Sequence, residues 1–112
     1  MANIYKNVGI DVTTTNLTSI YTVPALRTTI VKSIQLTNEH SSNNLVELHV
    51  TDSSESATFE FFHKTMATGT TENGVLSPLV LEAGDIVKIQ VGTANKIEGV
   101  MSYLEIFDEK ST

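Results

Sequence analysis

The feature that most restricts how this chain can fold is a regular alternation of apolar and polar side chains over short segments. The alternation is clearest over residues 45–51, where Val46, Leu48 and Val50 are separated by polar residues. Side chains two positions apart lie on the same face of a β-strand, so this pattern predicts a strand with one face on a core. Ala, Leu, Glu and Lys do not cluster at helical spacing.

Eight segments of this kind are separated by short clusters of Asn, Ser, Thr, Gly and Asp, which favour turns. Their Thr, Val, Ile and aromatic residues suit strands, because branching at Cβ is tolerated there and restricted in helices. We therefore expect one domain, residues 1–112, folded as an all-β antiparallel sandwich (jelly-roll-like or immunoglobulin-like) with about eight strands and almost no helix. The expected strands are residues 4–12, 17–23, 28–38, 45–51, 57–66, 75–81, 86–91 and 97–107.

The longest of the early strands contains a break in its alternation. Lys32 interrupts the row formed by Ile30, Ile34 and Leu36. This predicts either a β-bulge at that point or a lysine stem that lies along an apolar surface.

Segment 57–66 carries three phenylalanines whose positions do not fit one face of a regular strand. Phe59 and Phe61 have one parity and Phe62 the other, which favours a bulge in a central strand. The alternative is that one face contacts another subunit, because exposed apolar patches usually mark interfaces. The same alternative applies to one face of segment 97–107. Our candidate interface residues are Phe59, Phe61, Phe62, Met101, Tyr103 and Phe107.

The distribution of charge argues against a nucleic-acid partner, and the lengths of the apolar runs argue against a membrane. Seven basic residues are scattered singly among 13 acidic ones, giving a formal charge of −6. Nucleic-acid binding needs a concentrated positive patch, so we expect no nucleic-acid partner. Apolar runs are far shorter than the ~20 residues of a membrane-spanning helix, and residues 1–6 do not begin a secretory signal. We expect a soluble protein made in the cytoplasm, with no membrane partner and, lacking cysteine, no disulfide.

Three histidines are the first candidates for metal binding or proton transfer. His40 falls in an expected loop, while His49 and His63 fall on two different expected strands. Zinc sites usually contain closely spaced ligand pairs, and no spacing here brings two histidines onto one face. We therefore interpret them as surface or half-buried polar residues and expect no metal site.

The carboxylates and serines give no catalytic motif either. Asp52 and Glu55 lack the alternating carboxylates and glycine of a calcium loop, so we expect a solvated turn. Glu105, with Asp108 or Glu109, is best interpreted as solvated charge. Neither a Gly-x-Ser-x-Gly motif nor a glycine-rich phosphate loop occurs in the chain. We expect no enzymatic activity, no catalytic residues and no cofactor.

Several stretches of this sequence resemble the small structural proteins of tailed-phage particles, marine phages especially. In such proteins a strand that ends in Tyr-Thr-Val-Pro precedes a strand that ends in Asn, and a Leu-x-x-Gly-Asp turn joins two late strands. The matching stretches here are residues 2–7 (ANIYKN), 13–25 (TTTNLTSIYTVPA), 30–38 (IVKSIQLTN), 79–85 (LVLEAGD) and 87–91 (VKIQV).

The resemblance implies a protein of the virion that is made in the host cytoplasm. It implies partners such as the major capsid protein or other virion proteins, and homo-oligomerisation. A capsid decoration (cement) protein is favoured, because a small, acidic domain suits a clamp used in many copies. A tail, neck or fibre component is the first alternative. A carbohydrate- or ligand-binding sandwich is the alternative of another class, although the absence of tryptophan disfavours it.

Overall fold

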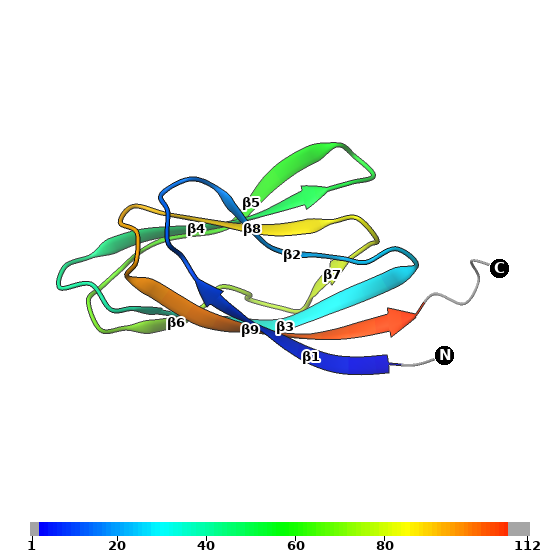
Figure 1. Cartoon of the computed structure of the whole chain (residues 1–112), viewed down its shortest axis with the longest axis horizontal. Coiled ribbons are helices and arrows are strands. Elements are labelled where there is room, and N and C mark those ends of the chain that lie inside the picture. Colours follow the sequence, from blue (N-terminus) through cyan, green and yellow to red (C-terminus); the bar gives the residue numbers. More distant parts are fainter. Residues whose placement is uncertain (1–2, 108–112) are drawn as a thin grey trace.

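The computed structural model of the chain describes residues 3–107, which fold into two antiparallel β-sheets packed face to face (Figure 1). Residues 3–107 contain no helix, and hence none that is long and apolar enough to cross a membrane. The predicted all-β sandwich is confirmed. Its strands are β1 (Asn3–Asp11), β2 (Thr18–Thr22), β3 (Arg27–Asn38), β4 (Asn44–Asp52), β5 (Ala57–Met66), β6 (Thr71–Asn73), β7 (Leu79–Leu81), β8 (Ile86–Val91) and β9 (Ile97–Phe107).

The order of the strands distinguishes between the two expected types of sandwich. One sheet, called sheet A below, has the order β1-β9-β3-β6, with β7 also paired to β3; sheet B has the order β2-β8-β4-β5. Along the chain, the neighbouring strands β4 and β5 are preceded by β3 and followed by β6 and β7, which pair with β3. Outside these strands come β2 and β8, which pair with each other, and outermost come β1 and β9, which also pair. One long antiparallel hairpin folded over on itself gives this nesting, which is the jelly-roll arrangement.

The expected strands all form, but one edge of sheet A differs from expectation. Segment 75–81 forms a strand only at Leu79–Leu81, after Pro78, and β6 lies inside a segment that we expected to be a loop. Both short strands pair with β3, β6 at Gln35–Thr37 and β7 at Thr29–Val31. They act as one edge strand with an interruption between them, where Pro78 cannot donate a hydrogen bond to the ladder.

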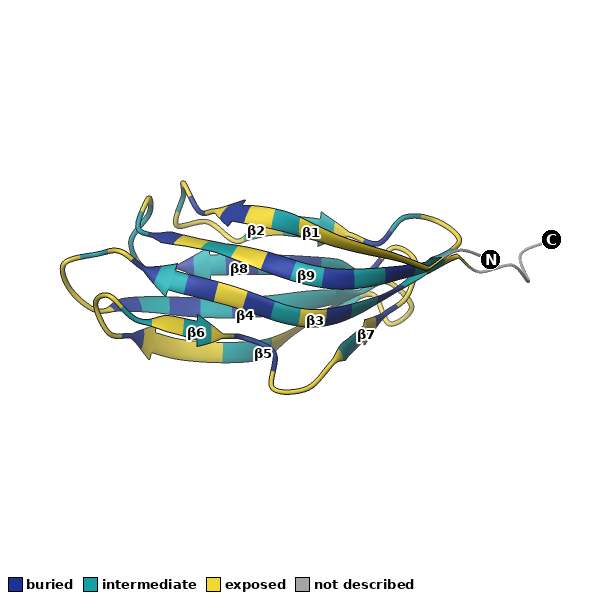
Figure 2. Cartoon of the chain, turned by 90° about the horizontal axis from the view of Figure 1, so that it is seen from below, coloured by how far each residue is buried: buried dark blue, intermediate teal, exposed yellow. Residues whose placement is uncertain are grey.

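The core lies between the sheets, and burial alternates along the strands as Figure 2 shows for β3 and β9. In β8, for example, Val87, Ile89 and Val91 point inward. Each fully buried aliphatic side chain of this size contributes about 1.5–3 kcal/mol relative to exposure.

The break at Lys32 is a β-bulge. The register between β3 and β9 shifts between Val31 and Ser33, and Lys32 is exposed. The shift changes which parity points inward, so Val31 lies in the core before the bulge and Ile34 after it. The bulge interpretation is confirmed, but Ile30 lies on the outer face of sheet A and not in the core row that we expected.

The phenylalanine segment is bulged as well. Leu48 of β4 pairs with Phe62 and the next residue, His49, pairs with Glu60, which leaves Phe61 as the extra residue in β5. The predicted bulge is confirmed. The prediction of a central strand is wrong, because within residues 3–107 β5 pairs only with β4 and forms an edge of sheet B.

Candidate functional site

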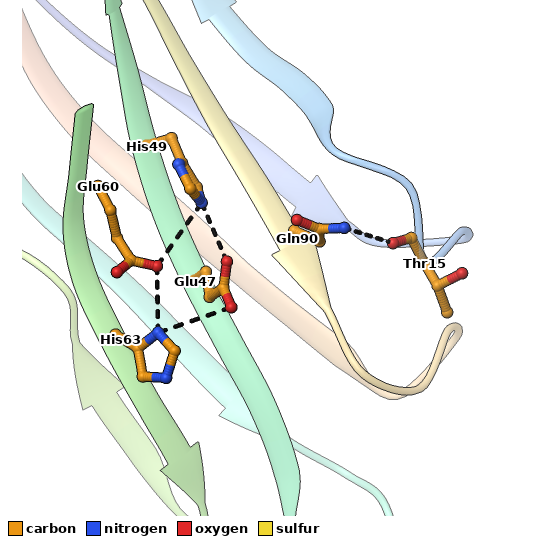
Figure 3. Close-up of polar contacts among 6 residues, drawn as sticks. All are labelled: Thr15, Glu47, His49, Glu60, His63 and Gln90. Atoms are coloured by element: carbon orange, nitrogen blue, oxygen red, sulfur yellow. Dashed lines mark hydrogen bonds and ion pairs between the residues drawn. The ribbon is translucent and has the colours of Figure 1, made fainter. Parts of the chain in front are cut away.

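Two histidines and two glutamates meet on the outer face of sheet B, and we call them the His–Glu cluster (Figure 3). Glu47 and His49 are two residues apart on β4, so they share a face. Their cross-strand partners on β5 are His63 and Glu60, respectively. The register therefore places each histidine directly opposite a glutamate.

The bulge at Phe61 makes this cluster possible. Glu60 and His63 are three residues apart, and in a regular strand they would point to opposite faces. The extra residue shifts the parity of β5 between them, so both side chains lie beside β4 on its outer side.

The four side chains form a closed ring of short contacts. His49 Nε2 lies 3.1 Å from Glu47 Oε1 and 3.8 Å from Glu60 Oε1. His63 Nδ1 lies 3.1 Å from Glu60 Oε1 and 3.6 Å from Glu47 Oε2. The hydrogen bond between Glu60 and His63 raises the pKa of His63 above its ordinary value and lowers the pKa of Glu60. The cluster is half open to solvent, because His63 is 56% exposed whereas the side chain of His49 is only 18% exposed.

The structure corrects the expectation that no two histidines share a face. His49 and His63 lie on one face and contact the same two glutamates. In a regular strand residues 60 and 63 would lie on opposite faces, so their spacing did not predict that they meet. The phenylalanine pattern nevertheless indicated a bulge between them. The third histidine, His40, lies apart and is half-buried, and its backbone N–H donates to Asn38 Oδ1.

The acidic residues behave in two different ways. Asp52 forms the solvated turn that we expected: its Oδ1 accepts hydrogen bonds from the Ser54 hydroxyl and backbone N–H, and the hydroxyl bond lowers the pKa of Asp52. The expectation that Glu105 is solvated is wrong, because its side chain is only 2% exposed. Glu105 shares the inward parity of β9 with Met101. Asp108 and Glu109 lie outside the described residues.

Three carboxylates at one end of the sandwich serve the turns of the backbone. Asp52, Glu82 and Asp85 have carboxylate oxygens within 4.8 Å of one another. The carboxylate of Asp85 accepts hydrogen bonds from the backbone N–H groups of Ser53 and Glu82. It thereby joins the turn after β4 to the turn before β8, in which Gly84 has a positive φ.

An apolar row crosses the outer face of sheet A, and we call it the outer ladder. Tyr5 of β1 pairs with Leu104 of β9, Leu104 with Ile30 of β3, and Ile30 with Val80 of β7. These residues therefore form one continuous line across the sheet. Tyr5 is 76% exposed and Val80 is 62% exposed, while Leu104 and Ile30 are half-buried. Sequence reasoning missed this row, because it depends on which strands become neighbours.

The six candidate interface residues are found in three environments. Met101 and Tyr103 lie in the core, so their assignment to a surface needs correction. Phe61 and Phe62 are partly buried and pack against the core. Phe59 and Phe107 are exposed, and the guanidinium of Arg27 lies 4.2 Å from the ring centre of Phe107. Phe59 and Phe107 are therefore the most exposed of the six candidates.

The sequence matches no protein-family model and no curated protein. Solved structures do resemble it. A chain from the disulfide-linked pili of Bacillus endospore appendages has a TM-score of 0.55 at 16% identity, over 95% of this chain and 88% of that one. A pentameric capsid protein from metagenomic phage sequences has a TM-score of 0.50 at 15% identity, over 95% of this chain and 62% of that one.

A chain of the infectious bursal disease virus particle has a TM-score of 0.52 at 6% identity. That likeness covers 92% of this chain but 30% of the viral one. This chain thus spans less than two thirds of either viral protein. At such low identities the likeness shows a common fold: the same type of β-sandwich occurs in a pilus protein and in proteins of virus particles.

Proposed function

We propose that this protein is a non-enzymatic structural component of a virus particle, and that it binds the outside of a phage capsid as a decoration, or cement, protein. The observation that carries the proposal is the outer ladder, an apolar line across the outer face of sheet A. Two further facts support it: the fold is shared with virus-particle proteins, and the sequence resembles small phage virion proteins.

The outer ladder has the properties of a contact surface. A soluble domain has no structural need to expose Tyr5 and Val80, since neither contributes to the core. Exposed apolar rows rimmed by polar residues typically mark interfaces. Because the four residues lie on a regular sheet, they are held rigidly and can dock with little loss of side-chain freedom.

The proposed partner is the major capsid protein, with copies of this chain beside one another on the shell. Small contacts suffice for such a clamp when many copies act together, since multivalent attachment multiplies modest affinities. The exposed edge strand β1 offers unpaired backbone groups through which a homo-oligomer could form.

The likeness to a pilus protein does not favour a pilus of that kind. Those pili are disulfide-linked, whereas this chain contains no cysteine with which to form such a link. The His–Glu cluster lies on an open sheet face where water has access to His63, an environment that gives an enzyme little control over its reactants.

The test is the protein content of purified phage particles whose genome encodes this sequence. We expect peptides of this sequence among the particle proteins identified by mass spectrometry. Hundreds of copies per particle support a capsid location, whereas about six to a dozen indicate the tail or neck, because symmetry sets the copy number. Absence of these peptides from intact particles contradicts a virion role.

A further inference from the structure

The His–Glu cluster has the ligand chemistry of a zinc site. Glu47, Glu60 and His63 bring ligand atoms within 4.8 Å of one another, and His49 contributes a fourth group on the same face. Imidazole nitrogens and carboxylate oxygens are ordinary zinc ligands. Magnesium and calcium prefer sites made of oxygen atoms alone. The imidazole of His63 therefore favours a transition-metal ion.

The spacing of three ligand groups is close to that around a tetrahedral ion. Bonds of ~2.0–2.1 Å at tetrahedral angles place neighbouring ligand atoms about 3.3–3.5 Å apart. His63 Nδ1 lies 3.1 Å from Glu60 Oε1 and 3.6 Å from Glu47 Oε2. His49 Nε2 lies 3.1 Å from Glu47 Oε1 and 3.8 Å from Glu60 Oε1, but His49 is not in the group whose ligand atoms all lie within 4.8 Å of one another. Glu47, Glu60 and His63 are therefore the candidate ligands, and His49 lies beside their carboxylates.

The charges nearest the cluster are of both signs. Glu47 and Glu60 carry two negative charges that a zinc ion would balance. On the neighbouring strand β8, Lys88 is the cross-strand partner of His49 and brings a positive charge that opposes a cation, whereas Gln90, the partner of Glu47, is neutral. The side-chain amide of Gln90 donates to the carbonyl of Thr15, as Figure 3 shows, so it does not compete for the cluster.

We propose that Glu47, Glu60 and His63 bind one zinc ion on the outer face of sheet B, with His49 beside the two carboxylates. The ion would fasten β5 to β4 at the bulge. A fastening there has a clear physical use, because β5 is an edge strand with a single neighbour and its ladder is interrupted at Phe61. This inference does not depend on the proposed virion role.

The test is zinc titration of the tag-free protein by calorimetry, together with thermal unfolding with and without zinc. We expect one ion per chain, a higher Tm with zinc, and no comparable effect of magnesium. Loss of a residue that supports a zinc ligand without touching the ion typically lowers zinc affinity about 10–100-fold. His63→Gln removes a ligand itself, so we expect it to lower zinc affinity by at least as much.

The matched control is His40→Gln, which removes a histidine outside the cluster. Unchanged circular dichroism of each variant without zinc establishes that it is folded. In proton–nitrogen NMR spectra, zinc should shift the imidazole signals of His49 and His63 and leave those of His40 in place. The inference is overturned if the wild-type protein binds no stoichiometric zinc, or if His63→Gln binds zinc as tightly as wild type.

Discussion

The hydroxyl of Tyr21 donates a hydrogen bond of 2.6 Å to the carboxylate of Glu105, and this bond joins the two sheets. Tyr21 belongs to β2 of sheet B and Glu105 to β9 of sheet A. The same carboxylate accepts a hydrogen bond of 2.6 Å from Arg27 and lies 3.6 Å from the ammonium of Lys6. A buried charge is tolerated only where its partners replace water, and these three residues do so.

Replacing Tyr21 with phenylalanine should weaken the fold. The ring can keep its packing against Tyr103, whose centre lies 4.5 Å away, while the buried carboxylate loses one donor. We expect the free energy of unfolding to fall by about 1–3 kcal/mol, measured by urea denaturation. The control is Tyr5→Phe at an exposed position, which should change it by less than about 0.5 kcal/mol. Equal effects of the two substitutions would contradict the role of this bond.

The same cluster predicts a dependence of stability on acid. Burial by itself raises the pKa of Glu105, but hydrogen bonds from Tyr21 and Arg27 and the positive charges of Lys6 and Arg27 lower it below the ordinary value. A lowered pKa stabilises the folded state above the ordinary pKa of glutamate, ~4.3, and this contribution disappears as the pH falls through the folded value.

Urea midpoints measured between about pH 7 and pH 2 test this dependence. We expect Glu105→Gln to be less stable than wild type at pH 7. The difference between the two proteins should shrink as the pH falls below the ordinary value for glutamate. A difference that stays constant over the whole range would mean that the charge of Glu105 does not support the fold.

Two glycines on neighbouring strands should respond in opposite ways to alanine. A Cβ at Gly99 would lie 2.0 Å from the carbonyl oxygen of Gln35, so β3 and β9 would have to separate. We expect Gly99→Ala to cost at least about 1–3 kcal/mol. Gly9 has nothing within 4 Å of such a Cβ, so Gly9→Ala should be neutral or stabilising by up to about 1 kcal/mol. Thermal unfolding of both variants measures this contrast, and similar Tm values would contradict it.

The proposed capsid contact predicts a surface variant that folds but does not bind. Val80→Asp puts a charge into the outer ladder, and we expect affinity for shells that lack the protein to fall at least about tenfold, as co-sedimentation measures. Leu76→Asp is the matched control, because Leu76 is 99% exposed and lies outside the ladder. Both variants should unfold near the wild-type temperature. Equal binding by the two variants would exclude the ladder from the contact.

Much of the fold could be predicted from the sequence, because short-range alternation and turn residues determine where strands form. The bounds of β5, β8 and β9 follow directly from this pattern. The bulges at Lys32 and Phe61 could be located too, since each changes the parity of the apolar residues around it. The strand β6 could not be predicted, because its three polar residues pair through backbone groups with β3 and show no apolar periodicity.

The sites were harder to predict, because they depend on which strands are neighbours. The His–Glu cluster depends on both the pairing of β4 with β5 and the register shift at Phe61. The position of a histidine in the sequence indicates neither of these features. Glu105 is buried because its parity on β9 matches that of Met101, yet glutamate is rarely assigned to a core. The outer ladder needs the full order of sheet A.

Under our proposal, the outer face of sheet A attaches this protein to a virus shell. A density map of the assembled particle, with this structure fitted into it, would show that attachment directly. We predict that Tyr5 and Val80 face a capsid subunit and are shielded from solvent, in hundreds of symmetry-related copies. A map in which the outer ladder faces solvent, or in which shell density contains no jelly roll of this size, would contradict the claim.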